Sequence, residues 1–536
     1  MRALRIGLSI RSEVLLTFTL AIANGCQSAR PPEPAAPPAH ELPKAAKAPA
    51  RASFADHYEA LANSAMRENR PTAETVRSLK DELLFQRATQ SYLWAMPVLN
   101  VLGMKAGSEK LFNAGYNVLP VWKKRLDANT LVTTPNCDVI VAMSYLDVGR
   151  DGPLVLEAAS GLQGVLLDFW QRPLPGPPAP GKDYRGDVGF FGPDQGRGGK
   201  FLVLPPGYKD RVPEGYFVFR SPTNNVLVFL HSLYKDAGDL APAVALIESA
   251  KIYPLKAKAG ARAMEFPDAS GVPANLLPAS DGSAFEQLKL FVDSEGPDFA
   301  DAEWRGMLAT LGIVKGQPFA PDARTRGLLD LAARTAYKAS RVLGLEESIS
   351  GASYKIYYDR HWQNPMASGK PDSFDPSWHR LPDGYLSLDA RVNFFTNQYA
   401  QSPGMAFPAL GKGVKYLVAR VDSGGGPLSG GSSYRLELPA NVPAANFWSL
   451  TLYDAENSSG LANGKAFPSL GSREHPARQP DGSIALYLGP SAPAGTESNW
   501  LATVPGKGYF AILRLYSPLE PALDGSWKPG DLQKVH

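Results

Sequence analysis

The hydrophobic positions of the chain first predict a long helix. From residue 72 onward, apolar residues recur at a spacing of three and four. They are Val76, Leu79, Leu83, Leu84, Ala88, Leu93 and Met96. This is the period of an amphipathic helix, for which Thr72 is a suitable N-cap and Glu74 a favourable first-turn residue. Pro97 should end or kink this helix, and a second short helical stretch is expected over residues 108–112.

The pattern then changes to short apolar runs separated by glycine and proline. These runs cover residues 139–145, 152–157, 164–169, 200–204, 215–220 and 225–230. Several short strands at this spacing are typical of a β-sandwich or barrel.

The helical period returns between residues 239 and 349, and strands follow again after about residue 386. The expected helices cover residues 241–250, 284–292, 303–311 and 324–345. The clearest late strands cover residues 414–421, 433–438, 447–453, 484–488 and 510–516. The aromatic residues of 447–453 alternate, which predicts that they form sandwich core.

The first residues have the pattern of an export signal. Arg2, Arg5 and Arg11 precede an apolar run over residues 14–23, which is too short to span a bilayer. Cys26 follows a small residue directly after this run, as in a bacterial lipobox. We therefore expect a lipoprotein-type signal peptide over residues 1–25 and a lipid on Cys26. The alternative is cleavage by ordinary signal peptidase.

A spacer follows the expected anchor. Residues 31–50 contain seven Pro and seven Ala, a composition that cannot bury a core and stays extended. Residues 26–52 are therefore predicted to be a tether. Gln27 rather than Asp follows the lipidated position, which favours the outer membrane, with the folded part facing the periplasm.

Composition and charge exclude several classes of protein. The 536 residues are 44% hydrophobic and 20% charged, which is ordinary for a globular protein. A net charge of +3 argues against nucleic acid as a partner. Two cysteines exclude a disulfide scaffold and a cysteine-based zinc site. Familiar nucleophile, nucleotide and metal motifs are absent from the sequence, so no cofactor and no metal are predicted.

Asn136 and Asp138 form the first candidate site, directly after Pro135. Asn and Asp after proline commonly form turns through bonds to the local backbone. The alternative is an amide and a carboxylate that face a ligand at the rim of a sandwich.

The second candidate site is the polar and aromatic segment 354–366. Its candidate ligand-binding residues are Tyr358, Arg360, Trp362 and Asn364. Such a mixture suits a concave ligand site, in which aromatic rings supply area and polar groups set orientation. His361, beside Asp359 and Arg360, is the candidate general acid or base. The alternative is a structural seam between domains.

The third candidate site comprises Asp389, Arg391 and Asn393. In a strand these residues share one face, and in a helix they still lie near one side. Arg220, at the end of a predicted strand, is a further candidate partner for an anionic ligand group, although a structural salt bridge explains it equally well.

Several long phrases of the sequence carry a family resemblance. Residues 446–454, 499–501, 510–518 and 523–529 resemble a family known as domain of unknown function 1214. Residues 134–138, 168–173, 200–208 and 220–224 resemble its usual companion, domain of unknown function 1254.

The resemblance covers roughly residues 55–536 and implies a β-rich mixed fold. That fold comprises an N-terminal helical part, a small β-sandwich, a helical middle and a C-terminal jelly-roll-like sandwich. It implies no settled chemistry. Many relatives carry Tyr three residues after the Asp of the Pro-Asn-x-Asp motif, whereas this chain has Val141.

Together these patterns predict a series of regions. They are an N-terminal helical part over residues 53–128, a 1254-like sandwich over 129–238, a helical middle over 239–350, a polar-aromatic linker over 351–385 and a 1214-like domain over 386–536.

Two functions remain open. The first is a ligand-binding protein of the cell envelope, with a pocket between two β domains for a small organic or sugar-like molecule. The second is a hydrolase or lyase acting at the same place, with Asp138, His361 and Asp389 as catalytic residues. Convergence of Asp138, Arg220, His361 and Asp389 in one pocket would favour the enzyme.

Overall fold

The computed structural model describes residues 54–113, 115–256, 262–345, 348–349, 352–353, 355–366 and 386–535. The chain divides into two compact units, Met1–Ser64 and Ala65–His536. The predicted signal peptide, Cys26 and the tether lie outside the described residues. In the first unit the structure describes helix α1 (Phe54–Ala62). No described helix combines the length and the apolar character that a membrane span requires.

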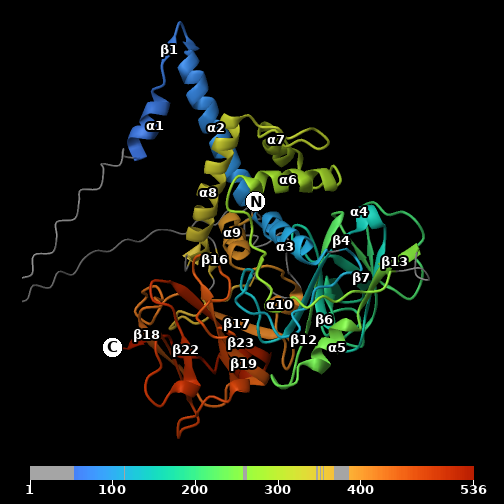
Figure 1. The fold of residues 1–536 in the computed structure, drawn as a ribbon, viewed down its shortest axis with the longest axis vertical. Coiled ribbons are helices and arrows are strands. Elements are labelled where there is room, and N and C mark those ends of the chain that lie inside the picture. Colours follow the sequence, from blue (N-terminus) through green and yellow to red (C-terminus); the bar gives the residue numbers. More distant parts are fainter. Residues whose placement is uncertain are drawn as a thin grey trace, which may run out of the picture. The chain divides into compact units, whose positions relative to one another are not determined.

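The second unit begins with a short hairpin and two consecutive helices (Figure 1). The hairpin, β1 (Met66–Arg67) and β2 (Arg70–Pro71), precedes α2 (Ala73–Trp94). As predicted, Thr72 caps α2, and its Oγ1 accepts a hydrogen bond from the Thr75 N–H at 3.2 Å. Helix α3 (Met96–Phe112) follows directly.

Pro97 therefore lies where α2 has ended and α3 begins. It lies in the first turn of α3, where a missing N–H leaves no helical bond unmade. The short helix predicted over residues 108–112 is the last part of this 17-residue helix. Most of α3 is buried around its circumference, so its sequence lacks the apolar stripe by which a surface helix is recognised.

The N-terminal sandwich consists of two four-stranded sheets with the orders β4-β12-β6-β9 and β11-β10-β5-β13. The strands of the first sheet are β4 (Ile140–Asp147), β6 (Gln163–Asp168), β9 (Asp187–Val188) and β12 (Asn225–Ser232). Those of the second are β5 (Leu154–Ala158), β10 (Gly199–Leu204), β11 (Phe217–Arg220) and β13 (Lys251–Pro254). Apolar side chains of both sheets, such as Leu166 and Phe201, share one buried cluster.

Minor elements complete the N-terminal sandwich. They are β3 (Thr130–Leu131) paired with β14 (Ala274–Asn275), the hairpin β7 (Pro175–Ala179) and β8 (Lys182–Arg185), and the helices α4 (Val148–Asp151) and α5 (Ala241–Glu248).

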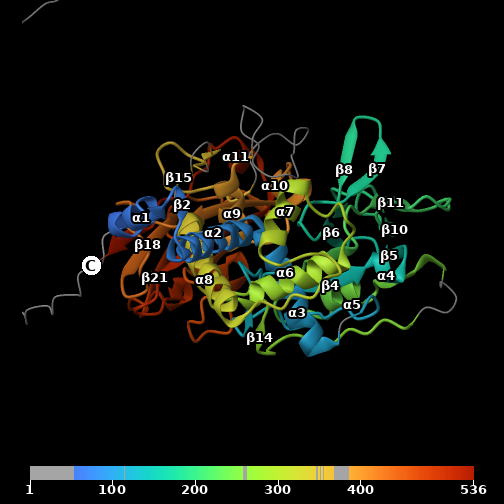
Figure 2. The ribbon, with the colours of Figure 1, turned by 90° about the horizontal axis from the view of Figure 1, so that it is seen from above.

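The helical middle packs against the N-terminal helices. Its helices are α6 (Ser283–Ser294), α7 (Ala302–Thr310) and α8 (Ala323–Leu345). Helix α8 lies along α2 and also contacts α9 (Leu388–Asn397) (Figure 2). The segment of Asp389 and Arg391, for which the sequence allowed strand or helix, is therefore a helix. A short pair, β15 (Ser348–Ile349) and β16 (Ala352–Ser353), follows α8.

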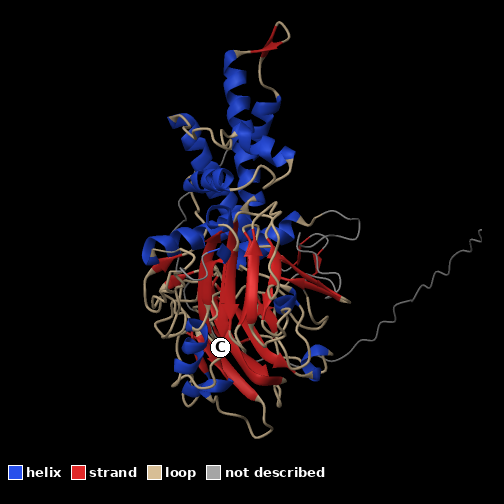
Figure 3. Ribbon diagram, turned by 90° about the vertical axis from the view of Figure 1, so that its right-hand side faces the viewer, coloured by secondary structure: helices blue, strands red, loops and turns tan. Residues whose placement is uncertain are grey.

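The C-terminal sandwich also has two four-stranded sheets, with the orders β17-β23-β19-β20 and β22-β21-β18-β24. In Figure 3 the strands of the protein are red and its helices blue. The first sheet contains β17 (Val414–Ala419), β19 (Ala444–Asp454), β20 (Ser469–Gly471) and β23 (Tyr509–Pro518). The second contains β18 (Ser433–Leu438), β21 (Ile484–Gly489), β22 (Trp500–Ala502) and β24 (Gln533–Val535). The short helices α10 (Pro403–Ala406) and α11 (Glu520–Leu523) flank it.

Strand β19 corrects one expectation about the aromatic run 447–453. Trp448 lies in the sandwich core with Leu450 and Leu452. Phe447 packs in the large central cluster and Tyr453 in a separate one, because alternate residues of a strand face opposite sides of the sheet. The outer face of this sheet is therefore covered by other parts of the chain rather than exposed to solvent.

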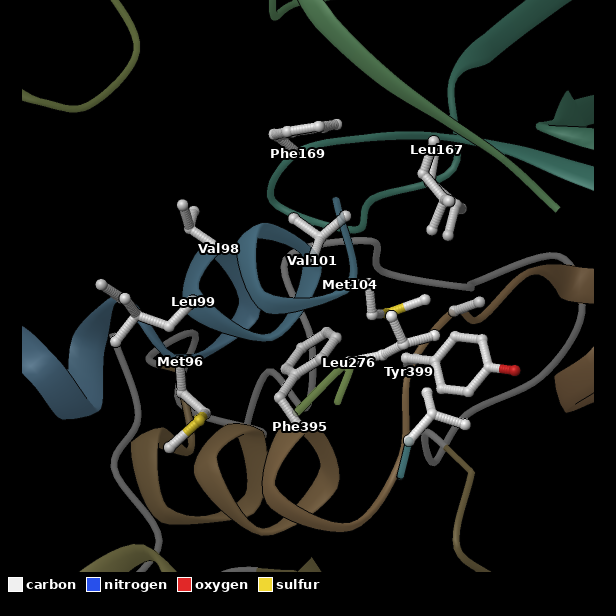
Figure 4. Packing of buried hydrophobic residues seen from close by; sticks show 14 of the residues in the cluster. Met96, Val98, Leu99, Val101, Met104, Leu167, Phe169, Leu276, Phe395 and Tyr399 are labelled. Carbon is white, nitrogen blue, oxygen red and sulfur yellow. The ribbon is translucent and has the colours of Figure 1, made fainter. Parts of the chain in front are cut away.

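A central hydrophobic cluster joins the two sandwiches to the helices. It contains residues of β4, β6 and β12, such as Leu167, together with Met96 and Leu99 of α3 and Phe395 of α9 (Figure 4). Phe447 and Tyr516 of the C-terminal sheet belong to it as well. The described chain is thus a mixed, β-rich fold, as predicted. The sheets β4-β12-β6-β9 and β17-β23-β19-β20, which we call the inner sheets of the two sandwiches, meet the same core.

Candidate functional site

A cavity of about 160 Å³ lies where the inner sheets of the two sandwiches approach each other. We call it the first cavity. Its N-terminal wall includes Val139, Gln163, Val165, Phe229 and His231, and its C-terminal wall includes Val414, Tyr416, Ile512, Arg514 and Tyr516. Those that lie in strands are two apart within each strand, so they project from the face that points away from their own sandwich core.

The segment after α9 forms the remaining wall. Gln398, Tyr399, Ala400, Ser402, Gly404 and Met405 line the cavity. Ala400 has a left-handed backbone with φ of 56°. Its N–H donates to Gln171 Oε1 at 2.8 Å, and Gln171 Nε2 donates to the carbonyl of Pro97 at 2.8 Å. This buried amide therefore fixes the loop against the start of α3.

Arg514 brings a positive charge to the cavity. The residue is only 2% exposed, and its Nη1 donates to Thr451 Oγ1 at 3.2 Å. Its Cζ lies 5.6 Å from the ring centre of Tyr453 and 5.7 Å from that of Tyr416. Among the described residues, no acceptor bonds its buried Nε and no carboxylate forms an ion pair with it.

The surroundings of Arg514 keep it charged. Burial alone would lower the pKa of Arg514, but Coulombic interactions with Tyr453, Tyr516 and Tyr416, followed by Asp138, raise it above its usual value. The guanidinium is therefore a cation at neutral pH, and one of its donors, Nε, has no partner among the described residues.

Phenol groups surround this cation. Asn136 Nδ2 donates to the hydroxyl of Tyr516 at 2.8 Å, and the ring of Tyr516 stacks on Phe447 with centroids 3.9 Å apart. Burial raises the pKa values of Tyr399 and Tyr416 above the usual range. At neutral pH these phenols are uncharged groups that can donate a hydrogen bond to a ligand.

Asp138 is not a lining residue of the cavity but connects the two sandwiches. Its Oδ1 is 3.3 Å from Arg125 Nη2 and accepts from Ser469 Oγ at 3.0 Å. Thr451 Oγ1 donates to its Oδ2 at 3.5 Å. Arg473 Nη1 donates to the Asp138 carbonyl at 2.9 Å. The carboxylate is buried, and protein groups supply its hydrogen bonds. Its geometry therefore fits a structural link between the two sandwiches.

Two further titratable groups line the cavity. Asp187 Oδ2 accepts from the Gly404 N–H at 3.1 Å, and its Oδ1 accepts from Ser402 Oγ. Burial raises the pKa of Asp187 to about 7, although both hydrogen bonds act in the opposite direction. A Cβ at position 404 would stand 2.8 Å from Asp187 Oδ1, so this approach requires glycine.

His231 contributes a neutral imidazole. Burial lowers the pKa of His231 to about 4. Its Nδ1 is buried and has no hydrogen-bond partner among the described residues. The first cavity thus combines apolar side chains with one buried charged donor, several neutral polar groups and a carboxyl whose pKa is raised toward neutral pH. In the described part of the chain, no cluster of three His, Cys, Asp or Glu residues could hold a metal ion.

The structure separates the four polar residues whose convergence the sequence analysis proposed as a sign of an enzyme. Asn136 lines the first cavity, whereas Asp138 does not. Arg220 is exposed at the end of β11, in the sheet that does not reach the cavity, and Asp389 is exposed in the first turn of α9. The backbone N–H of His361 donates to Asp531 at 3.0 Å, and His361 does not line the cavity.

The rest of the polar-aromatic segment has mainly structural contacts. Trp362 is buried in the C-terminal sandwich, where its Nε1 donates to the Gly530 carbonyl at 2.8 Å. Tyr358 is 90% exposed, and Arg360 pairs with Asp359 at 3.0 Å. Asn364 Oδ1 accepts from the Met366 N–H at 3.0 Å, which closes a local turn. Arg391 lines a different cavity, described below.

No sequence motif marks Arg514, His231 or Asp187. The available signal was a single polar side chain inside an apolar strand. Arg514 interrupts the run 510–516, and His231 ends the run 226–231. A polar residue of this kind is buried with its strand and needs a hydrogen-bond partner there. Only the packing of two distant sheets brings Arg514, His231 and Asp187 to one cavity.

Comparison with known proteins agrees with the predicted order of families. Residues 116–254 match the family described as protein of unknown function DUF1254, and residues 413–520 match protein of unknown function DUF1214. None of the curated proteins compared with the chain matches it.

Two solved structures are similar to the chain. The VPA0106 protein from Vibrio parahaemolyticus is 17% identical, and the match covers 85% of this chain and 100% of that chain with a TM-score of 0.49. An uncharacterised protein from Burkholderia cenocepacia is 13% identical, with 90% and 96% covered and a TM-score of 0.35.

Proposed function

The chain carries a DUF1254 region followed by a DUF1214 region, and we propose that it binds a small organic carboxylate in the first cavity. The observation that carries this proposal is Arg514, a buried cation at the cavity with an unused donor and no acidic partner among the described residues. An isolated buried charge is costly, and a carboxylate is the natural partner of a guanidinium.

The charge balance around the cavity supports an anionic ligand. Arg125 already neutralises Asp138, and Asp187 carries at most a partial charge at neutral pH because burial raises its pKa to about 7. Lys412 lines the cavity as a second basic residue and is exposed. Positive charge is therefore in excess where a ligand would sit.

The walls support a compact, apolar body on that ligand. Beside the polar groups named above and Thr134, Asn446 and Ser517, they consist of glycines and of aliphatic and aromatic side chains. They include Val139, Val165, Phe190, Phe191, Phe229, Leu233, Met366, Met405, Val414 and Ile512. A cavity of about 160 Å³ is close to the size at which apolar protein cavities bind benzene. Together with this volume, the apolar part of the walls favours a small organic acid with an apolar body.

Calorimetric titration with benzoate tests the proposal. We expect saturable binding of benzoate and much weaker binding of benzamide, which has the same shape without the charge. Arg514→Met should weaken benzoate binding by at least about tenfold, because a charge-assisted hydrogen bond is lost. Arg220→Met removes an exposed arginine and should leave binding unchanged. Equal affinity for benzoate in both variants would contradict the proposal.

Asp187 gives a second candidate function, that of a hydrolase or lyase. A carboxyl whose pKa lies near neutral pH, at the wall of a cavity, is suited to accept or donate a proton. Small hydroxy-carboxylates are the first substrates to test, since loss of water creates a conjugated double bond that absorbs ultraviolet light. Turnover that disappears in Asp187→Asn while binding persists would support the enzyme. Absence of turnover on carboxylates that bind would contradict it.

We also propose that the protein is anchored in the bacterial envelope by a lipid on Cys26. The support is the sequence pattern of residues 1–25 and the proline- and alanine-rich stretch that follows. Metabolic labelling with radioactive palmitate should mark the wild type and not Cys26→Ser, and the variant should leave the membrane fraction. An unlabelled wild-type protein would contradict the anchor.

A further inference from the structure

A second cavity lies where the junction of α2 and α3 meets α7 and α9. Its volume is about 260 Å³. Pro97, Phe299 and Phe395 are buried residues of its lining, and Asp301 and Leu388 are exposed residues at its edge. The first and second cavities share no lining residue.

Three tryptophans form one side of the second cavity. The rings of Trp94 and Trp304 stack with centroids 4.5 Å apart and an interplanar angle of 7°. Trp170 packs on Trp94 at 4.7 Å with an angle of 60°, and its Nε1 donates to the Phe299 carbonyl at 2.9 Å. Their contacts hold the rings in place before any ligand arrives. Preorganised aromatic surfaces of this kind favour flat ring systems.

Arg391 adds a charged donor to this aromatic surface. Its Nη2 donates to the Trp94 carbonyl at 3.1 Å, whereas its buried Nε has no hydrogen-bond partner among the described residues. No described carboxylate forms an ion pair with it. Arg172 lines the same cavity but is already paired with Asp168 at 2.7 Å. Asp301 is used as the N-cap of α7, where its Oδ1 accepts from the Trp304 N–H at 2.9 Å.

We propose that the second cavity is a separate binding site for a flat aromatic carboxylate. Arg391 binds the carboxylate through Nε, and the ring lies against the tryptophan surface. Burial lowers the pKa of Arg391 to about 10, which leaves it charged at neutral pH but in need of an anion. The stacked indole rings favour a fused aromatic ring system on the ligand.

The location of binding can be read directly from fluorine NMR of protein labelled with 5-fluorotryptophan. The three cavity resonances are assigned by single Trp→Phe variants, and the ligand probe is 2-naphthoate. We expect the resonances of Trp94, Trp170 and Trp304 to shift in a saturable way. Those of Trp448 and Trp527, in the C-terminal sandwich, should remain in place. Because no described tryptophan lines the first cavity, binding there cannot shift these three resonances by direct contact.

Variants and a neutral probe then test the role of the charge. Arg391→Gln should weaken 2-naphthoate binding by at least about tenfold, since a bond to a charged group is lost. Lys338→Gln removes the same charge from an exposed position of α8 and should change nothing. Trp304→Leu removes part of the aromatic surface and should also weaken binding. Absence of shifts in the wild type, equal binding of 2-naphthamide, or full affinity in Arg391→Gln would each overturn the proposal.

Discussion

The two walls of the first cavity use charge in opposite ways. On the N-terminal side the buried carboxylates have protein partners: Asp138 meets Arg125 and Ser469, and Asp187 meets Ser402 and Gly404. On the C-terminal side Arg514 is a buried cation whose Nε has no described partner. Both walls are parts of inner sheets with similar apolar packing, so their difference lies in the polar side chains.

This difference separates assembly from recognition. Charges that the protein itself satisfies hold the sandwiches together, and removing one partner leaves the other buried without compensation. A charge that the protein leaves partly unsatisfied is available to a ligand. We therefore assign structural work to the N-terminal wall and ligand recognition to the C-terminal wall.

The largest expected effect is that of Asp138→Ala on stability. The substitution leaves Arg125 buried without its carboxylate and removes acceptors from Ser469 and Thr451. We expect the free energy of unfolding to fall by about 3–5 kcal/mol. Urea denaturation measures it. The control is Asp389→Ala, in which an exposed aspartate is removed and about 0.5 kcal/mol or less should change. Equal effects would remove the structural role of Asp138.

The next effect is a pH dependence due to Asp187. Its pKa is about 7 in the folded protein and 3.8 ordinarily, so between these values the folded state holds a proton that the unfolded state releases. This carboxyl therefore makes stability fall as pH rises from about 4 to 7, by at most about 4 kcal/mol. His231, with a lowered pKa of about 4, acts in the opposite direction below its ordinary value of 6.5.

A comparison of two proteins isolates the contribution of Asp187. The wild type and Asp187→Asn are denatured with urea at several values between pH 4 and 7. The stability of the wild type relative to the variant should decrease steadily over this window. A constant difference would show that Asp187 titrates normally and that the N-terminal wall carries a full negative charge.

Much of the fold follows from local sequence, because strands and surface helices have distinct apolar periods. The predicted strands over residues 139–145, 225–230 and 510–516 correspond to β4, β12 and β23. Helix α3 was largely missed because it is buried on most sides and lacks an apolar stripe. The candidate site is less predictable from the sequence than the fold. Asn136 is marked by its local motif, whereas Arg514 and His231 become neighbours of one cavity only when two distant sheets pack together.

Tyr516→Phe should have a smaller effect than the two carboxylate variants. The substitution keeps the stacking on Phe447 and removes the hydroxyl that bonds to Asn136. We expect a loss of about 1 kcal/mol in the free energy of unfolding, the usual net value of one hydrogen bond. A loss comparable to that of Asp138→Ala would mean that the C-terminal wall is also part of the structural link between the two sandwiches.

The smallest expected change in stability is that of Arg514→Met, although Arg514 is as deeply buried as Asp138. Replacement of a buried charge by an apolar side chain of similar length is often neutral. We expect the free energy of unfolding to change by about 1 kcal/mol or less in urea denaturation. A loss of several kcal/mol would show that Arg514 has a structural role equal to that of Asp138.

A crystal structure of the protein with benzoate tests the central claim most directly. We predict one benzoate in the first cavity, with a carboxylate oxygen within about 3 Å of Arg514 Nε and the ring against the apolar side chains. The same crystals of Arg514→Met should lack it. An empty first cavity at saturating benzoate, or a benzoate whose carboxylate points away from Arg514, would contradict the assignment of recognition to the C-terminal wall.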